Sequence, residues 1–477
     1  MGVAKVFKKF PKTFWVANII ELFERWAWYG FFMLFANYLT GSVDTGALGL
    51  TQTEKGYIMG FGTAFLYFLP VLTGSIADKY GYKKVLFVAF VIYTTAFIFL
   101  PMVSSFWGVF GIFIYLAIGA ALFKPVISAT VAKTTTDETS SIGFGIFYMM
   151  VNIGAFIGPM VTLLFKNSSY DLVFYISAGI IALNFILLLF YKEPDRVVTK
   201  ESLGESLKTV FVNIGKVLAD FKFVVFLAIV AGFWTMYNQL FFTLPVFIAQ
   251  WVDTSAVYDF FSVNIPFFSE NYGKADGQME AEFITNFDAM FIIIFQIVVS
   301  SIVMRIKPLK TMTVGFLVCS IGMALTLATQ NVMYTIGAIL IFSLGEMAGS
   351  PKITEYIGRI APLDKKALYM GYSFIPVFVG NALAGLISGG VYQNLSDKTE
   401  FVQQEVAKRG LDISDSLSQN DYFETAATQM GMSSRELTNY LWDAYHPYDM
   451  WYVILGIGLV SVIALYLYDR FMMREKK

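Results

Sequence analysis

Charged side chains are scarce in this sequence. Only 14% of its 477 residues are Asp, Glu, Lys or Arg, whereas a soluble domain normally has about a quarter. Cysteine and histidine occur once each, so Cys319 can form no intramolecular disulfide. The only histidine, His446, lies outside the long apolar segments, in which no metal-ligand cluster appears. The phosphate-binding pattern GxxxxGK[ST] is missing, and the net charge of −1 favours no nucleic-acid partner. These absences disfavour a membrane enzyme, and we expect no metal, no cofactor and no catalytic residues.

Apolar residues, by contrast, are abundant and occur in long runs. The sequence is 57% hydrophobic and 17% aromatic, with a mean hydropathy of +0.62. A helix needs about 20 apolar residues to cross a bilayer, and twelve such runs predict an all-α, multi-pass protein of the cell (inner) membrane. The predicted spans are 15–40, 54–78, 84–103, 106–131, 142–165, 172–191, 223–250, 283–304, 309–329, 332–358, 367–393 and 449–470.

Lys and Arg cluster in alternate loops, which predicts the orientation of the chain. They precede the first span, follow spans two and eight, fill the segment between spans six and seven, and close the chain; they are Lys5, Lys8, Lys9, Lys12, Lys79, Lys83, Lys84, Lys192, Arg196, Lys200, Lys208, Lys216, Lys222, Arg305, Lys307, Lys310, Arg470, Arg474, Lys476 and Lys477. Basic loops stay on the cytoplasmic side. Both termini and the central linker are therefore predicted to be cytoplasmic.

Two long segments fall on the predicted outer side. Segment 251–282 carries six acids and one Lys, and segment 394–447 carries nine acids, four bases and His446. Stretches such as TEFVQQEVAKRG have helical character, so a small external cap is one interpretation. Solvated connecting loops are the interpretation we favour from sequence alone.

An internal repeat emerges when the sequence is shifted by 226 residues. Pro125 then falls on Pro351, Lys133 on Arg359 and Gly154 on Gly380. Membrane helices share Gly and Pro in any case, but a whole set in one register favours two related six-helix halves. This arrangement resembles that of major facilitator transporters, whose substrates bind between parallel repeats. We predict an N-terminal bundle at 1–191, a cytoplasmic linker at 192–222 and a C-terminal bundle at 223–477.

The stretch GSIADKYGYKK, between spans two and three, strengthens that resemblance. It is similar to the cytoplasmic loop signature of major facilitators through Gly74, Asp78, Gly81 and the bases that follow. Asp78 can pair with a base or a helix N-terminus, and Gly81 permits a tight turn. A merely basic cytoplasmic loop is the alternative.

Few ionisable residues lie inside the predicted spans. Glu21, Glu24 and Arg25 share span one, in ELFERWAWYG, while Lys124 lies in span four and Glu346 in span ten. Each costs at least about 2.5–3.5 kcal/mol in hydrocarbon, so these side chains should face a cavity or one another. Glu21 and Arg25 are four residues apart and lie on one helix face. The two acids exceed the local base by one, which Lys124 could balance; a buried ion-pair network with only a structural role is the alternative.

Several motifs together resemble the proton-dependent oligopeptide transporters. ExxERWxWY at Glu21–Tyr29 is close to that family's ExxERFxYY, LFKPVIS is similar to its fourth-helix lysine motif, and FYMMVNIGAF is similar to FYxxINxGS of its fifth helix. YFLP, GFWTMYNQ and GEMAGSP resemble its second, seventh and tenth helices. The single motifs are weak, but as a set they are specific and extend along much of the chain.

This resemblance implies proton-coupled import of di- and tripeptides or related zwitterionic solutes by a monomer. It implies proton coupling by Glu21, Glu24, Arg25 and Lys124. Lys124 would also attract the peptide carboxylate, and Glu346 with Asn152 would hold its amino group. The remaining residues expected at the substrate are Tyr29, Tyr67, Tyr148, Asn238, Asp288 and Ser350.

The departures from the family pattern warn against naming the cargo. Phe32 stands where the family commonly has an arginine, and Asn238 stands where it has a glutamate. Losing both together avoids an orphan charge but removes a carboxylate-binding group. The alternative function is therefore a major facilitator transporter that imports or exports an amino acid conjugate, an anion or a drug. A receptor with this fold is disfavoured because the ExxER residues and Lys124 are retained.

Overall fold

The computed structural model describes residues 9–473, except 137–138, 167–168, 196–203, 206–207, 210–211, 213–214, 216–218 and 362–365. The chain forms two compact units, each assembled from three stretches. Unit 1 comprises Met1–Phe32, Gly62–Val224 and Leu363–Phe378, and unit 2 comprises Met33–Phe61, Val225–Pro362 and Val379–Lys477. This grouping follows contacts rather than sequence order. The division at 1–191, 192–222 and 223–477 stays a prediction, and much of segment 192–222 lies outside the described residues.

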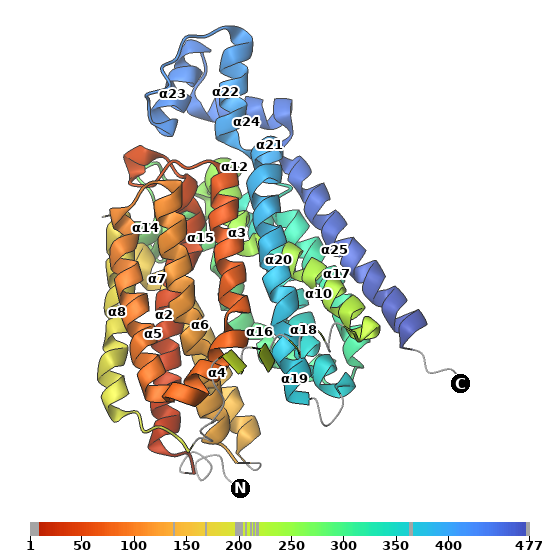
Figure 1. Ribbon diagram of the computed structural model, residues 1–477. Helices are drawn as coiled ribbons and strands as arrows, with labels where there is room; N and C mark the ends of the chain where they lie inside the picture. Colours follow the sequence, from red (N-terminus) through yellow and green to blue (C-terminus); the bar gives the residue numbers. More distant parts are fainter. Residues whose placement is uncertain are drawn as a thin grey trace. The chain divides into compact units, whose positions relative to one another are not determined.

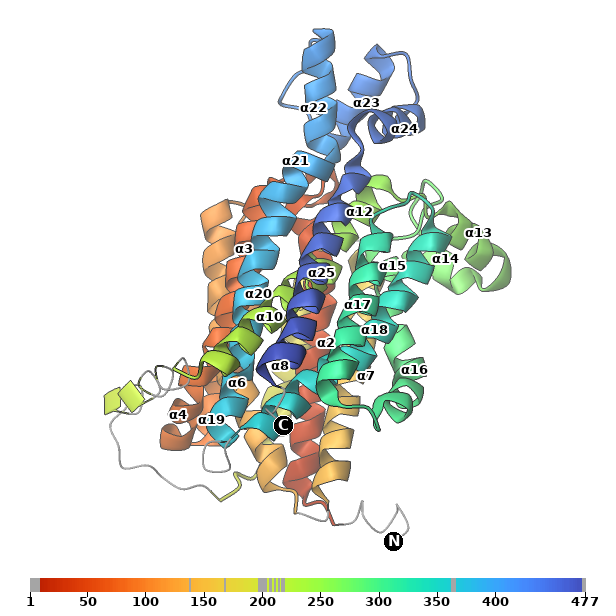
Figure 2. The same cartoon turned by 90° about the vertical axis from the view of Figure 1, so that its right-hand side faces the viewer.

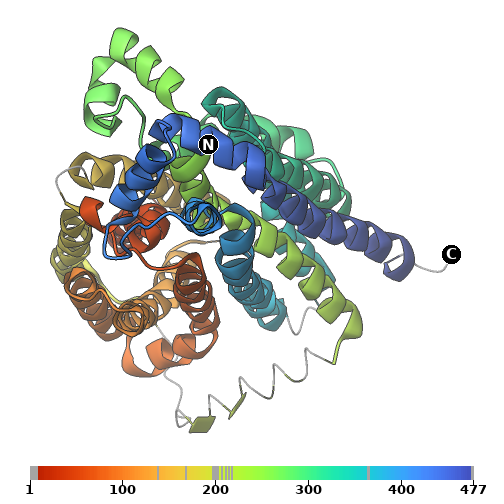
Figure 3. The same ribbon diagram turned by 90° about the horizontal axis from the view of Figure 1, so that it is seen from above.

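Unit 1 is a bundle of long helices (Figures 1 and 3). It contains the first part of α2 (Lys12–Thr40), the last part of α3 (Gln52–Phe68) from Gly62 on, and α4 (Pro70–Tyr80), α5 (Tyr82–Phe99), α6 (Phe106–Lys133), α7 (Ser140–Lys166), α8 (Tyr170–Phe190) and α19 (Lys366–Gly371). Helix α5 packs on α6 and α8, and α4 packs on α6. Ser105 and Ser169 cap the N-termini of α6 and α8 by accepting backbone hydrogen bonds from Gly108 and Asp171, as serine favours at that position.

The turn between α4 and α5 contains the predicted loop signature. Gly81 has φ of +103°, a conformation that glycine adopts without a Cβ clash. The hydroxyl of Tyr82 donates a 3.1 Å hydrogen bond to Asp78 Oδ1, and Glu193 Oε1 accepts one from the backbone N–H of Tyr82. The signature residues thus join two helices through a tight, hydrogen-bonded turn.

Unit 2 contains the other membrane helices and the segment that follows α21 (Figure 2). Its helices are the end of α2 and the start of α3, then α10 (Phe221–Tyr237), α11 (Gln239–Phe242), α12 (Leu244–Trp251), α13 (Ser255–Asn264), α14 (Pro266–Tyr272), α15 (Ala281–Thr285), α16 (Phe287–Val303), α17 (Pro308–Thr326), α18 (Val332–Ile360), α20 (Ile375–Leu386), α21 (Tyr392–Ser396), α22 (Lys398–Arg409), α23 (Gln419–Gln429), α24 (Ser434–Tyr445) and α25 (Met450–Leu467). Helix α17 packs between α18 and α25, and α16 packs on α18. Helices α22, α23 and α24, which we call the cap, group together beyond α21 (Figure 1).

Eleven helical stretches of the described residues are long and apolar enough to cross a membrane. They match the predicted spans two to twelve within a few residues at most ends. The stretch that corresponds to the eleventh predicted span, Tyr369–Arg409, runs on into the cap. Helix α2, the first predicted span, has 29 residues but is not among them because Glu21, Glu24 and Arg25 interrupt its apolar run. The predicted all-α membrane fold is confirmed, with α2 as the twelfth long helix.

The 226-residue repeat is visible in the helix bounds. Helices α5, α6 and α7 begin at Tyr82, Phe106 and Ser140, and α17, α18 and α19 begin 226 residues later, at Pro308, Val332 and Lys366. Helices α6 and α18 also carry their internal prolines, Pro125 and Pro351, at the corresponding position. The sequence repeat is therefore a repeat of structural elements.

Two predictions about the chain path were wrong. Predicted span 223–250 is divided into α10, α11 and α12, with breaks at Asn238 and Thr243; Pro245 lies at the start of α12, where it cannot donate the hydrogen bond that a continuous helix requires. The favoured interpretation of 251–282 and 394–447 as connecting loops also fails, since most of their residues form helices α13, α14 and α21–α24. The other interpretation of 394–447, a small helical cap, agrees with the structure. Its helices are amphipathic and pack together by burying Phe401, Tyr422, Leu437 and Leu441.

Candidate functional site

The ionisable residues of α2 form one buried network in unit 1. Arg25 donates to Glu24 twice, from Nε to Oε2 at 2.5 Å and from Nη2 to Oε1 at 2.6 Å. Tyr93 of α5 donates its hydroxyl to Glu24 Oε1 at 2.5 Å. Glu21, one turn earlier, lies 3.5 Å from Arg25 Nε. All four residues are at most 6% exposed, so two carboxylates share one guanidinium in a buried environment.

Lys124 does not join this network as an ion pair. Its ammonium lies 4.6 Å from the centre of the Tyr67 ring, and none of the ion pairs among the described residues includes it. It does act electrostatically on Glu21. Helix α6 thus places the predicted base near the α2 acids while leaving its N–H donors available.

The other predicted residues of unit 1 surround these groups in different ways. Arg25 lies 5.7 Å from the ring centre of Tyr29. Tyr148 is exposed, and its carbonyl accepts a 2.9 Å hydrogen bond from the side chain of Asn152 one turn later. Phe32 is buried and stacks on Trp28 with 5.0 Å between ring centres. An aromatic stack therefore occupies the position where the resemblance implies an arginine.

Unit 2 holds the predicted acidic residues of the second half. Tyr237 of α10 donates a 2.7 Å hydrogen bond to Glu346 Oε1, while Glu346 Oε2 is buried with no hydrogen-bond partner among the described residues. Asp288 of α16 accepts a 2.5 Å hydrogen bond from Ser343. A buried acceptor without a donor is costly, so Glu346 is suited to receive a donor from a bound solute.

Two further predicted residues flank Glu346 or its neighbour Tyr237. Ser350 lies one turn after Glu346 on α18. Asn238 follows Tyr237 at the first break of the divided helix, and its buried side-chain nitrogen has no acceptor among the described residues. Among the predicted site residues of unit 2, Asn238 Nδ2 and Glu346 Oε2 are therefore buried polar atoms without a hydrogen-bond partner in the described part of the chain.

A second buried charge cluster in unit 2 was not predicted. Lys55 Nζ donates to Gln52 Oε1 at 2.8 Å and to the carbonyl of Phe242 at 2.9 Å. Gln52 and Gln250 each donate to Asp397 Oδ1, at 3.1 and 2.7 Å. The ring closes through Tyr392, which donates to Gln250 Oε1 at 2.9 Å and lies 5.2 Å from the Lys55 ammonium. We call Lys55, Gln52, Asp397, Gln250 and Tyr392 the Lys55 cluster.

The Lys55 cluster fixes the start of α3 to α12 and to the end of α21. Lys55 is fully buried and Gln52 is 2% exposed. Gly60 of α3 also lies so close to Gly385 of α20 that an added Cβ would be 2.6 Å from the Gly385 Cα, which only glycine tolerates. Nearby, Asn37 of α2 donates to Glu282 Oε1 at 2.8 Å. Lys55 and Glu282 were missed because they fall at the edges of predicted spans, where charges are ordinary; only their partners show that they are buried.

The bundles of long apolar helices, with structural repeats and buried ionisable residues, define a polytopic membrane transporter. The chain belongs to the Major Facilitator Superfamily, whose family model matches residues 17–385. This assignment confirms the predicted major facilitator fold.

Known relatives agree with this class. The uncharacterized MFS-type transporter YqjV of Bacillus subtilis is 23% identical over 77% of this chain and 83% of its own. The multidrug resistance protein MdtH of Photorhabdus laumondii is 20% identical over 76% and 82%, and the peptide transporter PTR_B of Candidozyma auris is 26% identical over 45% and 43%. The crystal structure of a POT family transporter in complex with 5-aminolevulinic acid shares the fold with a TM-score of 0.68, at 17% identity, over 98% of this chain and 99% of that one.

Proposed function

We propose that the chain is a proton-coupled symporter that imports di- and tripeptides or related small zwitterionic solutes by alternating access. The observation that carries the proposal is the α2 network, in which Glu21 and Glu24 share Arg25. Within α2 one base faces two buried acids, and an excess charge in the membrane is expensive. A proton on one carboxylate removes that excess, and its loss restores it. Proton binding can in this way favour one arrangement of the helices over another.

The polar groups of each unit support a zwitterionic substrate. Lys124, which has no anionic partner in an ion pair among the described residues, suits the carboxylate of a peptide. Glu346 Oε2, a buried acceptor without a donor, suits its ammonium group. Each of these groups would favour, through a charge-assisted hydrogen bond, a solute that carries the opposite charge, and a zwitterion carries both charges. The peptide transporter among the relatives and the POT family structure that shares the fold support the same substrate class.

A non-peptide substrate is the second candidate. Phe32 stacks on Trp28 where the resemblance implies an arginine, which leaves one carboxylate-binding group fewer. MdtH, a multidrug resistance protein, matches more of this chain than the peptide transporter does. These two observations favour an apolar or singly charged solute, and such a transporter could also export its cargo.

Ligand-dependent thermal stabilisation of the purified protein separates the two candidates. A ligand that binds the native state raises its stability by an amount that grows with concentration. Free dipeptides should raise the melting temperature, whereas the same dipeptides with an N-acetyl or a C-terminal amide group should do so weakly. Stabilisation by anions or hydrophobic drugs alone, with no response to free dipeptides, would replace the peptide proposal by the second candidate.

A further inference from the structure

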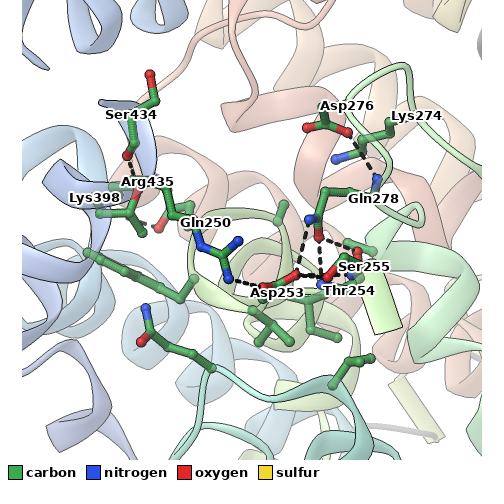
Figure 4. Close-up of a pocket in the computed structure, with 18 of the residues that line it drawn as sticks. Gln250, Asp253, Thr254, Ser255, Lys274, Asp276, Gln278, Lys398, Ser434 and Arg435 are labelled. Carbon is green, nitrogen blue, oxygen red and sulfur yellow. Dashed lines mark hydrogen bonds and ion pairs between the residues drawn. The ribbon is translucent and has the colours of Figure 1, made fainter. Parts of the chain in front are cut away.

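A polar cavity of about 730 Å³ lies inside unit 2, between the cap and the segment that follows α12. One wall consists of cap residues, including Lys398, Phe423, Ser434 and Arg435, and the other is formed around Asp253 and Gln278 (Figure 4). The volume is within the range of about 300–1,000 Å³ that is typical of small-molecule sites. None of the predicted transport residues lines it.

Most charged groups of this cavity already have partners. Arg435 crosses it to Asp253, with Nη2 and Oδ2 2.8 Å apart (Figure 4). Burial would raise the pKa of Asp253, but hydrogen bonds from Ser255 and Gln278 and the charge of Arg435 outweigh it and hold that pKa below its ordinary value. Lys274 lies 4.0 Å from Glu280, and Asp276 accepts the backbone N–H of Gln278. These contacts shape the cavity. Two charged side chains that line it, those of Lys398 and Glu424, have no hydrogen bond or ion pair among the described residues.

Lys398 is the first of these two charges. Its ammonium lies 4.3 Å from the ring centre of Phe423 and 5.7 Å from that of Trp251. Aromatic faces attract a cation, but they leave its three N–H donors without acceptors. Among the described residues, no oxygen accepts a hydrogen bond from Lys398 Nζ and no carboxylate pairs with it; the backbone N–H of Lys398, not its ammonium, donates to Gln250 Oε1.

Glu424 is the second charge. It lines the same cavity from α23 and is exposed, and within the described part of the chain its carboxylate has no ion-pair partner and, unlike that of Asp276, accepts no hydrogen bond. The cavity is lined by three bases, Lys274, Lys398 and Arg435, and by three acids, Asp253, Asp276 and Glu424. Equal numbers of each favour a ligand without net charge. One available base and one available acid favour a ligand whose own charges are separated.

We propose that the cap cavity is a second binding site, which takes a small zwitterionic solute with its carboxylate on Lys398 and its ammonium on Glu424. The rings of Phe423 and Trp251 would enclose the aliphatic part of such a solute beside the Lys398 ammonium. The identity of the ligand rests on the substrate class in the proposed function, whereas the existence of the site rests on the cavity alone. Asp397 of the Lys55 cluster directly precedes Lys398, so a ligand in the cavity would alter the contacts of that cluster.

Hydrogen–deuterium exchange of the purified full-length protein locates this binding directly. Alanyl-alanine at increasing concentration should slow exchange in 398–409, 419–429 and 434–445, and its C-terminal amide should not. Lys398→Gln should raise the dipeptide concentration needed for half-maximal protection by at least about tenfold, since it removes a charge-assisted hydrogen bond. Lys398→Arg should retain protection. Lys408→Gln is the matched control, because Lys408 is an exposed residue of the same helix outside the cavity.

The outcomes separate the site from the transport proposal. Absence of protection in the cap at saturating dipeptide, or equal protection in Lys398→Gln and the wild type, overturns the cap site. Glu424→Gln gives an independent check: if it is folded and binds the dipeptide as the wild type does, the ammonium position is wrong. Protection of the cap without any uptake in vesicles would retain the site and contradict the proposed function. Uptake without protection of the cap would retain the proposed function and contradict the cap site.

Discussion

Arg25 binds its immediate neighbour Glu24 through two nitrogens, with contacts of 2.5 and 2.6 Å. The same guanidinium lies 3.5 Å from Glu21. The two carboxylates are bound unequally. Both oxygens of Glu24 accept hydrogen bonds from Arg25, whereas Glu21 has only the longer, 3.5 Å contact with this guanidinium. Glu24 is therefore held in place by Arg25 and Tyr93, and Glu21 is the carboxylate with fewer restraints. This difference decides which variants should alter structure and which should alter coupling.

Tyr93→Phe should destabilise the protein and reduce proton-driven accumulation. The change removes the 2.5 Å hydrogen bond to Glu24 and leaves a buried carboxylate with one donor fewer, at a cost of about 1–3 kcal/mol. Thermal unfolding of the solubilised protein and uptake into proteoliposomes measure the two effects. Tyr115→Phe, which removes only a hydroxyl that contacts Thr95, is the control. Equal stability of the Tyr93 variant and the wild type would show that this hydrogen bond does not hold Glu24.

Lys124→Ala should abolish uphill uptake. Lys124 is the base of α6 that acts on Glu21 and has no ion-pair partner among the described residues, so its loss removes both a balancing charge and a carboxylate anchor. Uptake of labelled dipeptide under a pH gradient is the measurement. Lys133→Ala, an exposed residue near the end of the same helix, should transport normally. Unchanged accumulation in the Lys124 variant would remove this residue from the coupling mechanism.

Glu346→Gln should weaken the binding of solutes with a free amine more than that of N-acetylated ones. The variant retains an acceptor for Tyr237 but loses the charge at the unsatisfied Oε2. A lost charge-assisted hydrogen bond of about 1.5–3 kcal/mol corresponds to a rise in Kd of about 10- to 150-fold. Competition assays with paired free and N-acetyl dipeptides measure it, with Glu355→Gln on the same helix as control. An equal loss for both members of each pair would argue against an amine site.

Lys55→Met should loosen the helix ends that the Lys55 cluster joins. It leaves Gln52 and the Phe242 carbonyl without a donor and leaves Asp397 as a buried acid without a compensating base. Exchange of deuterium into 52–61 and 385–396 should accelerate, by about 5- to 150-fold for a cost of about 1–3 kcal/mol. Lys310→Met, at an exposed position, is the control.

Adding Asp397→Asn to Lys55→Met should restore part of the protection. The double variant no longer buries a single uncompensated charge, which is the costly state. The destabilisation of the double variant is compared with the sum of the destabilisations of Lys55→Met and Asp397→Asn. A double variant that exchanges faster than this sum implies would show that the two charges do not compensate each other across Gln52.

The stability of helix α24 in the cap should decline below about pH 4.5. Glu436 forms a capping box with Ser433, and hydrogen bonds from the Ser433 backbone and hydroxyl lower the pKa of Glu436 from 4.5. A carboxyl with a lowered folded-state pKa contributes stability above its unfolded value and loses it as pH falls through the folded value. Exchange in 434–445, corrected for intrinsic rates, should show this loss. Glu436→Gln should reduce the pH dependence, whereas Asp443→Asn should retain it.

Much of the fold could be predicted because the length of an apolar run in the sequence indicates the length of a membrane helix. Spans two to six and eight to ten follow from apolar runs, and the structure ends them within a few residues of the prediction. The repeat was visible too, since its register preserved Pro125 and Pro351 in both halves. The breaks in span seven were not predicted, because Asn238 and Thr243 are polar but common in membrane helices. Pro245 was the one signal of a break in that run.

The candidate site was predictable only where neighbours in sequence are neighbours in space. Glu21, Glu24 and Arg25 interact along one helix, so their network could be inferred from spacing. Tyr93 joins it from 69 residues away, and nothing in its own sequence context marks it. Lys55 meets a carbonyl 187 residues on, and Gln52 meets Asp397 after 345 residues. Such contacts depend on tertiary packing, which residue patterns alone do not contain.

A proton gradient should drive transport through the α2 carboxylates. The most direct measurement is the uptake of labelled dipeptide into proteoliposomes with an acidic exterior, with and without an agent that collapses the gradient. The wild type should accumulate dipeptide above its external concentration, Glu21→Gln should only equilibrate it, and Asp171→Asn, an exposed acid of α8, should behave as the wild type. Accumulation that is independent of the gradient, or an undiminished gradient response in Glu21→Gln, would contradict the account.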